Sequence, residues 1–316
     1  MKKGKRRKIR RSILFLLIGS LVVIAALVGI RMWGDEEDGM LSAKTLASTY
    51  GEGLMEDAQL LSSQKQQGLD ERIQAYLTAN GISPASVQYS IEDLTTHERF
   101  TKDAQMNVTA ASVYKLPLAM LYYEKIDEGE VSEQTLYTYE ASHYGQGGPI
   151  SLRYSVGDQI ELGELLEALI IESDNTAGHI LYENLGGWLA FKQAITKYSD
   201  TPQSDEFFSY DNVLNADYVG DVLGYLYAHE EEYAQLIDDL KEAMPGEYLE
   251  SVIQPETAQK YGLYDVYRNV AGIVYGEHPY SIAIFSSLGE SGSRVIGEIN
   301  AICYEYFNGV SWEAPA

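Results

Sequence analysis

Cysteine is almost absent from this sequence, and basic side chains are scarce beyond the first 31 residues. Cys303 is the single cysteine among 316 residues, which excludes an intrachain disulfide. It lies in the apolar pattern VIGEINAICYEYF, which indicates a small residue of a buried helix face. After residue 31 the chain holds 14 basic residues against 47 acidic ones, a net charge of −33. Such a surface favours solubility and repels polyanions, so we expect no nucleic-acid partner.

Motifs for two other kinds of catalytic site are also missing. No G-x-S-x-G segment is present to carry a Ser-His-Asp hydrolase, and Gly289-Glu290-Ser291-Gly292 is typical of a turn that starts a helix. The five histidines show no H-E-x-x-H or other ligand spacing, so we predict no metal and no cofactor; they are His97, His143, His179, His229 and His278.

The N-terminus combines a strong basic cluster with a long uncharged segment. Eight lysines and arginines fall within residues 1–11, and the eighteen residues from Ile13 to Ile30 carry no charge. A helix of that length spans about 27 Å, close to the thickness of a bilayer core. No good A-x-A cleavage site follows. The sequence therefore predicts a cytoplasmic tail over 1–11 and a transmembrane anchor over 12–31, with the C-terminal part outside, at a bacterial cell surface.

Beyond the anchor, the composition indicates two regions. Residues 32–68 are acidic and rich in Ser, Gly and Gln without a sustained apolar face, which predicts an extracellular stalk. Residues 69–316 are long enough for one large domain. Helical periodicity dominates from residue 112 to about 228, with strand-like segments before it and three more near 257–288. We predict an α/β fold of the α+β sandwich type, in which both ends of the domain build one antiparallel sheet, helices flank it, and an all-helical lobe is inserted.

Ser112 and Lys115 open an apolar run, AASVYKLPLAMLYYEKI. Residues three apart share a helix face, so the Lys115 amine can reach the Ser112 hydroxyl. A lysine buried among apolar side chains can have its pKa lowered enough to accept a proton from a serine nucleophile. The alternative is that Ser112 caps the helix and Lys115 is a solvated residue of its first turn. Ser62 and Lys65 have the same spacing, but they lie in a polar stretch that no apolar helix follows, so the spacing there does not indicate a buried pair.

Two further motifs follow in the chain. Ser173-Asp174-Asn175 comes after the apolar helical pattern ELGELLEALIIE, and Lys260-Tyr261-Gly262 lies in a predicted strand. A helix cap or an Asx turn is the other interpretation of Ser-Asp-Asn. The three motifs in this order indicate an acyl-transfer site, which we expect in a cleft between the sheet and the helical lobe.

With these motifs the sequence resembles the class A β-lactamase and penicillin-binding serine hydrolase superfamily, whose S-x-x-K, S-D-N and K-T-G elements match in order over residues 69–316. The resemblance implies that Ser112 is acylated, that Lys115 acts as its base, and that Ser173 relays a proton to the leaving nitrogen. It further implies that Asn175 binds the substrate amide and Lys260 supplies positive charge. The backbone N–H groups of Ser112 and Leu263 would form the oxyanion hole, and Gly262 would leave room for substrate.

Two departures from the family pattern concern specificity and turnover. Tyr261 stands where the family has a small Thr or Ser hydroxyl that helps to hold a substrate carboxylate. The family's deacylating glutamate is also missing, because ungapped counting places Ser209 near its position. Glu206, Asp205 and Asp211 are nearby but do not form the E-x-x-L-N pattern. Efficient β-lactam hydrolysis is therefore not expected.

The sequence thus predicts a membrane-anchored extracytoplasmic serine hydrolase that forms an acyl-enzyme on Ser112 and deacylates weakly. Its expected substrates are small molecules or peptides, namely cell-wall peptide or β-lactam-like amides, and the expected state is a monomer. The alternative is a non-catalytic β-lactamase-like binding or structural domain at the cell wall.

Overall fold

The computed structural model describes residues 68–309. The predicted tail, anchor and most of the stalk lie outside this range. Among the residues that it describes, no helix is both long and apolar enough to cross a membrane.

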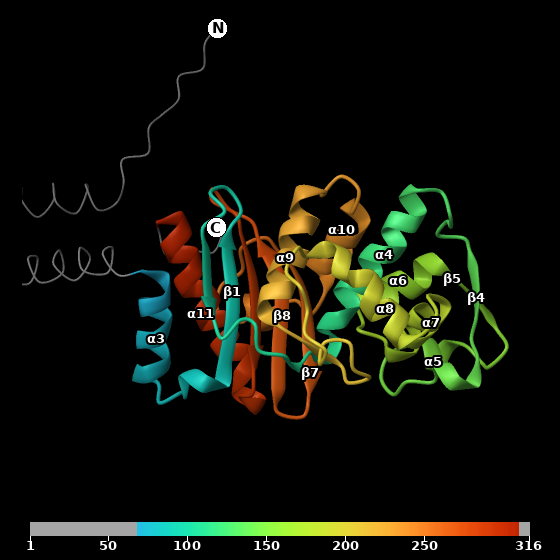
Figure 1. Cartoon of the computed structure of the whole chain (residues 1–316), viewed down its shortest axis with the longest axis horizontal. Helices are drawn as coiled ribbons and strands as arrows, with labels where there is room; N and C mark the ends of the chain where they lie inside the picture. Colours follow the sequence, from blue (N-terminus) through green and yellow to red (C-terminus); the bar gives the residue numbers. More distant parts are fainter. Residues whose placement is uncertain (1–67, 310–316) are drawn as a thin grey trace, which may run out of the picture. The chain divides into compact units, whose positions relative to one another are not determined.

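A five-stranded antiparallel sheet, in the order β2-β1-β9-β8-β7, forms the centre of the described chain (Figure 1). Its N-terminal strands are β1 (Val87–Asp93) and β2 (Arg99–Lys102), and its C-terminal strands are β7 (Thr257–Tyr264), β8 (Tyr267–Val274) and β9 (Tyr280–Ser286). The two groups meet where β1 pairs with β9, with Ile91 opposite Ile282. Strand β7 is left at an edge, so one side of its backbone can face a ligand.

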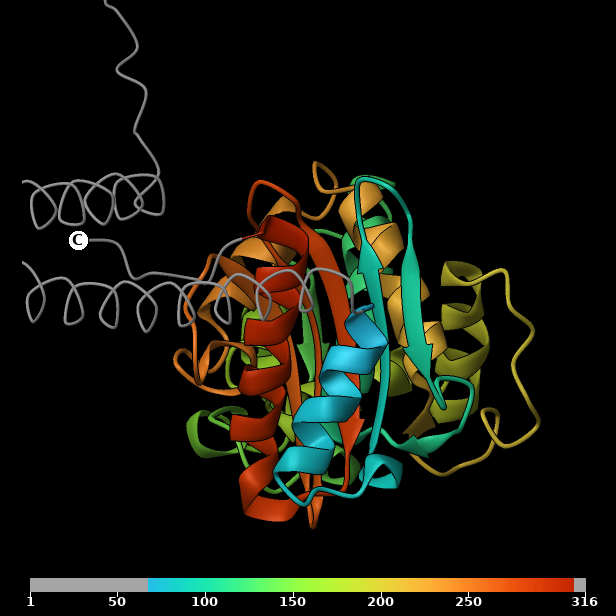
Figure 2. The same ribbon diagram turned by 90° about the vertical axis from the view of Figure 1, so that its left-hand side faces the viewer.

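Helices cover both faces of this sheet. Helices α3 (Leu69–Ala79) and α11 (Gly292–Asn308) pack together on one face, as Figure 2 shows. Their apolar residues and those of the sheet form one core, which includes Ile73, Ile282 and Ile299. Helices α9 (Ala216–Ala228) and α10 (Ala234–Glu242) pack against β1, β7, β8 and β9 on the opposite face. Because β9 has helices on both sides, all seven of its residues are buried.

The inserted lobe lies between β2 and β7 in the sequence, and a larger core joins it to the sheet. Its helices are α4 (Lys115–Asp127), α5 (Ile150–Arg153), α6 (Leu162–Ile170), α7 (Asn175–Asn184) and α8 (Trp188–Ala194). Two short ladders accompany them, β3 (Val108–Thr109) with β6 (Val213–Leu214) and β4 (Leu136–Thr138) with β5 (Gln159–Glu161). Single 3-10 turns complete the chain at η1 (Pro84–Ser86), η2 (Ala111–Tyr114), η3 (Ala141–His143), η4 (Ile195–Tyr198), η5 (Tyr248–Glu250) and η6 (Gly289–Ser291).

The predicted fold class is confirmed, with one difference in the lobe. The lobe is not all-helical, because the β4–β5 ladder lies within it. These strands have three residues each, too few for a recognisable alternation of apolar and polar side chains. The predicted helix-start turn at Gly289 is present as η6, and Cys303 is fully buried in α11.

Candidate active site

Ser112 lies in the 3-10 turn η2, which hydrogen bonds from two other segments hold in place. The amide of Asn212 donates to the Ala111 carbonyl at 2.7 Å, and the amide of Asn269 on β8 donates to the Thr109 carbonyl at 2.8 Å. Ala111 has a φ of +50°, in the left-handed region that residues other than glycine rarely adopt. The turn that presents Ser112 is therefore under local backbone strain, which the surrounding contacts maintain.

The capping alternative for Ser112 is wrong, as is the solvated position for Lys115. Helix α4 begins at Lys115, its cap residue is Tyr114, and no side chain caps it. Lys115 is fully buried. The sequence placed Ser112 on the helix itself, whereas the structure places it in the preceding 3-10 turn. Because side chains three apart eclipse one another in a 3-10 turn, Ser112 and Lys115 still lie on one side of the chain.

The Lys115 amine joins the first motif to the second. Its Nζ donates to the Ser173 carbonyl at 2.5 Å and to Asn175 Oδ1 at 2.7 Å, and it lies 3.3 Å from Ser173 Oγ. Burial lowers the pKa of Lys115 to about 7, although the nearby Asp174 carboxylate partly opposes this shift. Near neutral pH a large fraction of Lys115 is therefore an uncharged amine that can accept a proton.

The Ser-Asp-Asn segment is also a helix cap, so its two interpretations are compatible. Asp174 is the cap of α7, and its Oδ1 accepts the Ala177 N–H at 2.8 Å. Its Oδ2 accepts the Ile150 N–H, also at 2.8 Å, which fixes the turn against α5. Ser173 has a φ of +53°. Asp174 therefore anchors the turn, and Ser173 and Asn175 on either side of it contact Lys115.

Strand β7 brings the third motif against the turn that carries Ser112. A Cβ placed on Gly262 would lie 2.8 Å from the Ala110 carbonyl oxygen and 3.2 Å from the Ser112 backbone nitrogen. The absence of a side chain at Gly262 thus allows the strand and the turn to touch. Leu263, the other residue predicted for the oxyanion hole, follows directly along β7 and is 55 % exposed.

The side chains of Lys260 and Tyr261, which are neighbours in the sequence, are in contact. Lys260 is fully buried, and its Nζ lies 3.9 Å from the centroid of the Tyr261 ring. Burial and the neighbouring Lys115 lower the pKa of Lys260 well below its ordinary value. Burial raises the pKa of the Tyr261 phenol, which a hydrogen bond with Ser173 partly lowers again. The phenol of Tyr261 therefore reaches Ser173 of the second motif.

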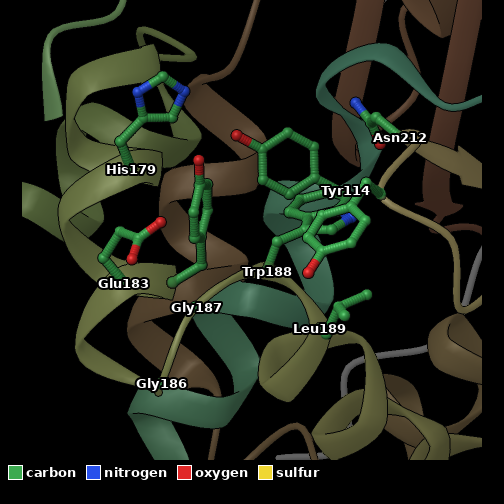
Figure 3. A pocket seen from close by; sticks show the side chains of 10 residues that line it. Tyr114, His179, Glu183, Gly186, Gly187, Trp188, Leu189 and Asn212 are labelled. Atoms are coloured by element: carbon green, nitrogen blue, oxygen red, sulfur yellow. The ribbon is translucent and has the colours of Figure 1, made fainter. Parts of the chain in front are cut away.

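Beside the nucleophile turn lies a cavity of about 650 Å³. Figure 3 shows its walls, with His179 and Glu183 from α7 on one side and Asn212 on the other. Its lining residues are Tyr114, His179, Tyr182, Glu183, Gly186, Gly187, Trp188, Leu189, Tyr210 and Asn212. The cavity size is within the range of small-ligand sites. Within residues 68–309, no group of three or more His, Cys, Asp or Glu side chains could hold a metal ion.

The three acids considered as substitutes for a deacylating glutamate do not line this cavity. Asp205, Glu206 and Asp211 are all exposed, and the one hydrogen bond described for the Glu206 carboxylate comes from Asn107 at 3.3 Å. Ser209 uses its carbonyl to accept the Trp188 indole N–H. The cavity therefore has one carboxylate in its lining, that of Glu183, which lies on α7.

Sequence reasoning missed two polar residues that support this region. One is Asn212, whose side chain donates to the Ala111 carbonyl. The other is Lys192, which is fully buried. Its Nζ lies 2.6 Å from the Val213 carbonyl oxygen and 4.0 Å from the centroid of the Phe207 ring. Burial lowers the pKa of Lys192 to about 7. An isolated asparagine in a loop and a lysine on an amphipathic helix carry no motif, so nothing in the sequence distinguished them.

Comparison with known proteins identifies the family. The profile of the "Beta-lactamase enzyme family" matches residues 67–307. The chain belongs to that beta-lactamase family. Membership makes it a serine hydrolase of the β-lactamase and penicillin-binding type, and the resemblance inferred from the three motifs is confirmed.

Solved structures similar to this beta-lactamase family member share its fold at low sequence identity. PBP-A matches with a TM-score of 0.66 and 18 % identity, covering 77 % of this chain and 96 % of PBP-A. An ancestral class A β-lactamase matches with a TM-score of 0.66 and 20 % identity, over 76 % and 100 % of the two chains. A β-lactamase from Sphaerobacter thermophilus matches with a TM-score of 0.64 and 20 % identity, covering 75 % of this chain and 97 % of that β-lactamase.

Proposed function

We propose that Ser112 is the nucleophile of a serine hydrolase that forms an acyl-enzyme with cell-wall peptides or β-lactam-like amides and releases it slowly. The observation that carries this proposal is the position of Lys115. Its buried amine contacts both Ser173 and Asn175 and has a pKa of about 7, lowered by burial. A lysine in that state can act as a base for a hydroxyl close by in the chain.

In the proposed reaction, Ser112 Oγ forms a bond to the carbonyl carbon of the substrate. Its proton passes to the Lys115 amine, and the backbone N–H groups of Ser112 and Leu263 stabilise the negative charge on the carbonyl oxygen. The bond between that carbon and the leaving nitrogen then breaks, and the nitrogen takes a proton through Ser173 Oγ, which is 3.3 Å from Lys115 Nζ. The products of this step are the free amine and the acylated serine.

The proposed slow release of the acyl group is supported by the absence of the family's E-x-x-L-N pattern and by the positions of the three acids nearest to it in the sequence. Hydrolysis needs a base that activates water, and Asp205, Glu206 and Asp211 are exposed outside the cavity lining. One similar structure is described as an acyl-enzyme complex of a PBP-A mutant with penicillin G. A penicillin is therefore a suitable first probe of this chain as well.

We expect intact-mass analysis to show one covalent adduct that persists from minutes to hours after incubation with penicillin G or with an uncharged activated ester. Ser112→Ala should remove the adduct because it lacks the nucleophilic oxygen. A folded wild-type protein that gives no adduct with either reagent would exclude the proposed activity. It would favour the second candidate, a non-catalytic binding domain, for which Tyr261 and the departure from the family's E-x-x-L-N pattern are the supporting observations.

We also propose that the domain is held outside the bacterial cytoplasmic membrane by residues 12–31, from the uncharged segment and the basic residues before it. In cells, the full-length chain should sediment with membranes, and a protease added to spheroplasts should remove the domain. A chain that begins at residue 32 should lose membrane association if expressed without the segment. Sedimentation of this shortened chain with membranes would contradict the role of the anchor.

A further inference from the structure

Aromatic rings form much of the wall of the cavity beside the nucleophile turn. Tyr114, Tyr182, Trp188 and Tyr210 line it. The Trp188 ring is inclined by 76° to that of Tyr114 and by 77° to that of Tyr182, with centroids 5.2 and 5.4 Å away. Tyr210 is 81 % exposed. Because nearly perpendicular rings turn their faces in different directions, several of them can contact one compact ligand group at the same time.

The lining of this cavity carries a negative charge. Glu183 is its one carboxylate, and no lysine or arginine of residues 68–309 lines it. Figure 3 shows Glu183 on the opposite side of the cavity from Tyr114 and Asn212. A Cβ on Gly187 would lie 3.7 Å from Glu183 Oε2, so the carboxylate lies beside a wall that has no side chain. Within the described chain Glu183 makes no hydrogen bond or ion pair, and it can therefore pair with a ligand cation.

The polar side chains of the lining have acceptors to spare. The side-chain N–H groups of Trp188, His179 and Asn212 each donate to a backbone carbonyl, at 3.2, 3.1 and 2.7 Å. Burial lowers the pKa of His179 below its ordinary value, so the ring is neutral and its Nε2 is an acceptor. Asn212 Oδ1 is buried without a hydrogen-bond partner among the described residues. A ligand that donates hydrogen bonds would satisfy these two atoms.

Two buried lysines lie near these rings but are not part of the lining. Lys115 Nζ is 5.8 Å from the centroid of the Tyr114 ring, and Lys192 Nζ is 5.6 Å from that of Trp188. Each amine donates to a backbone carbonyl. Burial lowers the pKa of both lysines to about 7, so at pH 8 both are mostly uncharged. The charge that a ligand meets in the cavity at that pH is therefore mainly that of Glu183.

We propose that this cavity binds a primary ammonium group carried on an alkyl chain. The aromatic rings contact the chain and the cation, Glu183 pairs with its charge, and His179 Nε2 and Asn212 Oδ1 accept its N–H groups. The net charge of −24 on the whole chain adds a long-range attraction for cations. Binding of the ammonium group does not require acyl transfer to Ser112, so it goes beyond the proposed function and is tested separately from it.

The test compares n-butylammonium with 1-butanol, which has a similar size but no charge. Binding to the full-length chain in a nonionic detergent is measured at pH 8 by isothermal titration calorimetry. We expect a Kd of about 1 mM for n-butylammonium and at least about tenfold weaker binding of 1-butanol. Glu183→Gln keeps the size of the side chain and should weaken n-butylammonium binding at least about fivefold. Tyr210→Leu removes an exposed ring without disturbing the core and should weaken it about threefold.

Glu128→Gln is the matched control, because Glu128 is an exposed residue at the end of α4 that does not line the cavity. It changes the net charge as Glu183→Gln does and should leave the affinity unchanged. Equal affinities for the two probes, or no saturable binding of n-butylammonium up to about 20 mM, would overturn the inference. So would an unchanged affinity in a Glu183→Gln variant with the wild-type circular dichroism spectrum, or an equal loss in Glu128→Gln.

Ser112→Ala separates this inference from the proposed function. The variant lacks the nucleophilic oxygen but keeps the cavity lining, so it should bind n-butylammonium as the wild type does. If the wild type formed no covalent adduct yet bound n-butylammonium through Glu183, the acyl transfer would be excluded and the ammonium site would stand. Formation of the adduct without binding of n-butylammonium would give the opposite result.

Discussion

Replacing Lys115 by methionine is expected to slow acylation of Ser112 by about 10³-fold, within the range usual for loss of a general base. The variant keeps a side chain of similar length but loses the amine that contacts Ser173 and Asn175. The rate is measured by the appearance of the covalent adduct in intact-mass spectra. A variant that acylates at the wild-type rate would leave Lys115 with a structural role only.

The pH dependence of the same measurement separates a base from a packing residue. Because burial lowers the pKa of Lys115 to about 7, its amine is mostly protonated below that pH and mostly neutral above it. The wild-type acylation rate should rise about tenfold per unit below pH 7 and level off above it, whereas Lys115→Met should show no such rise. The melting temperature should change little, since removal of a buried amine relieves desolvation while three hydrogen bonds are lost.

Gly262→Ala is expected to lower both activity and stability. The new Cβ would lie 2.8 Å from the Ala110 carbonyl oxygen and 3.2 Å from the Ser112 nitrogen, and both of these atoms belong to the backbone. Relief of this clash requires β7 and the nucleophile turn to move apart. We expect about a 10²-fold loss of acylation and destabilisation by about 1–3 kcal/mol.

Gly224→Ala is the matched control for this substitution. Gly224 lies inside α9, and a Cβ there would meet no heavy atom within 4 Å. Alanine is favoured over glycine in a helix, so this variant should be as stable as the wild type or slightly more so, with unchanged acylation. If Gly262→Ala acylated at the wild-type rate, close contact between β7 and the turn would not be needed for the reaction.

The fold could be predicted from the sequence where patterns are long. The helix at Leu69–Ala79, the strands near Lys260 and the terminal helix show sustained periodicity, and the structure has them at those places. The four short strands of the two small ladders have two or three residues each, so pairing with a distant partner determines them rather than local pattern. The membrane anchor stays a prediction.

The sequence also predicts that the first two motifs lie close together, because their residues have a recognisable spacing. It does not predict how the side chains around these motifs pack. Whether Tyr261 extends into the solvent or lies over Lys260 depends on the edge of the sheet and on packing against Tyr248, whose ring centroid is 5.5 Å away. Burial of Lys192 likewise depends on Phe207, which comes from another segment. Such properties arise from tertiary contacts, which single-residue propensities do not contain.

The pairing of β1 with β9 has a consequence for biosynthesis. Ile91 pairs with Ile282, which lies 191 residues later in the chain. Until that segment has been made, β1 has a single neighbour, β2, and its apolar side chains lack their final cover. Contacts within the helical lobe join residues that are closer together in the sequence, so they can form earlier during synthesis. A ribosome-bound chain that ends before Tyr280 should therefore remain sensitive to protease at its N-terminal hairpin, and resistance should appear abruptly once β9 has emerged.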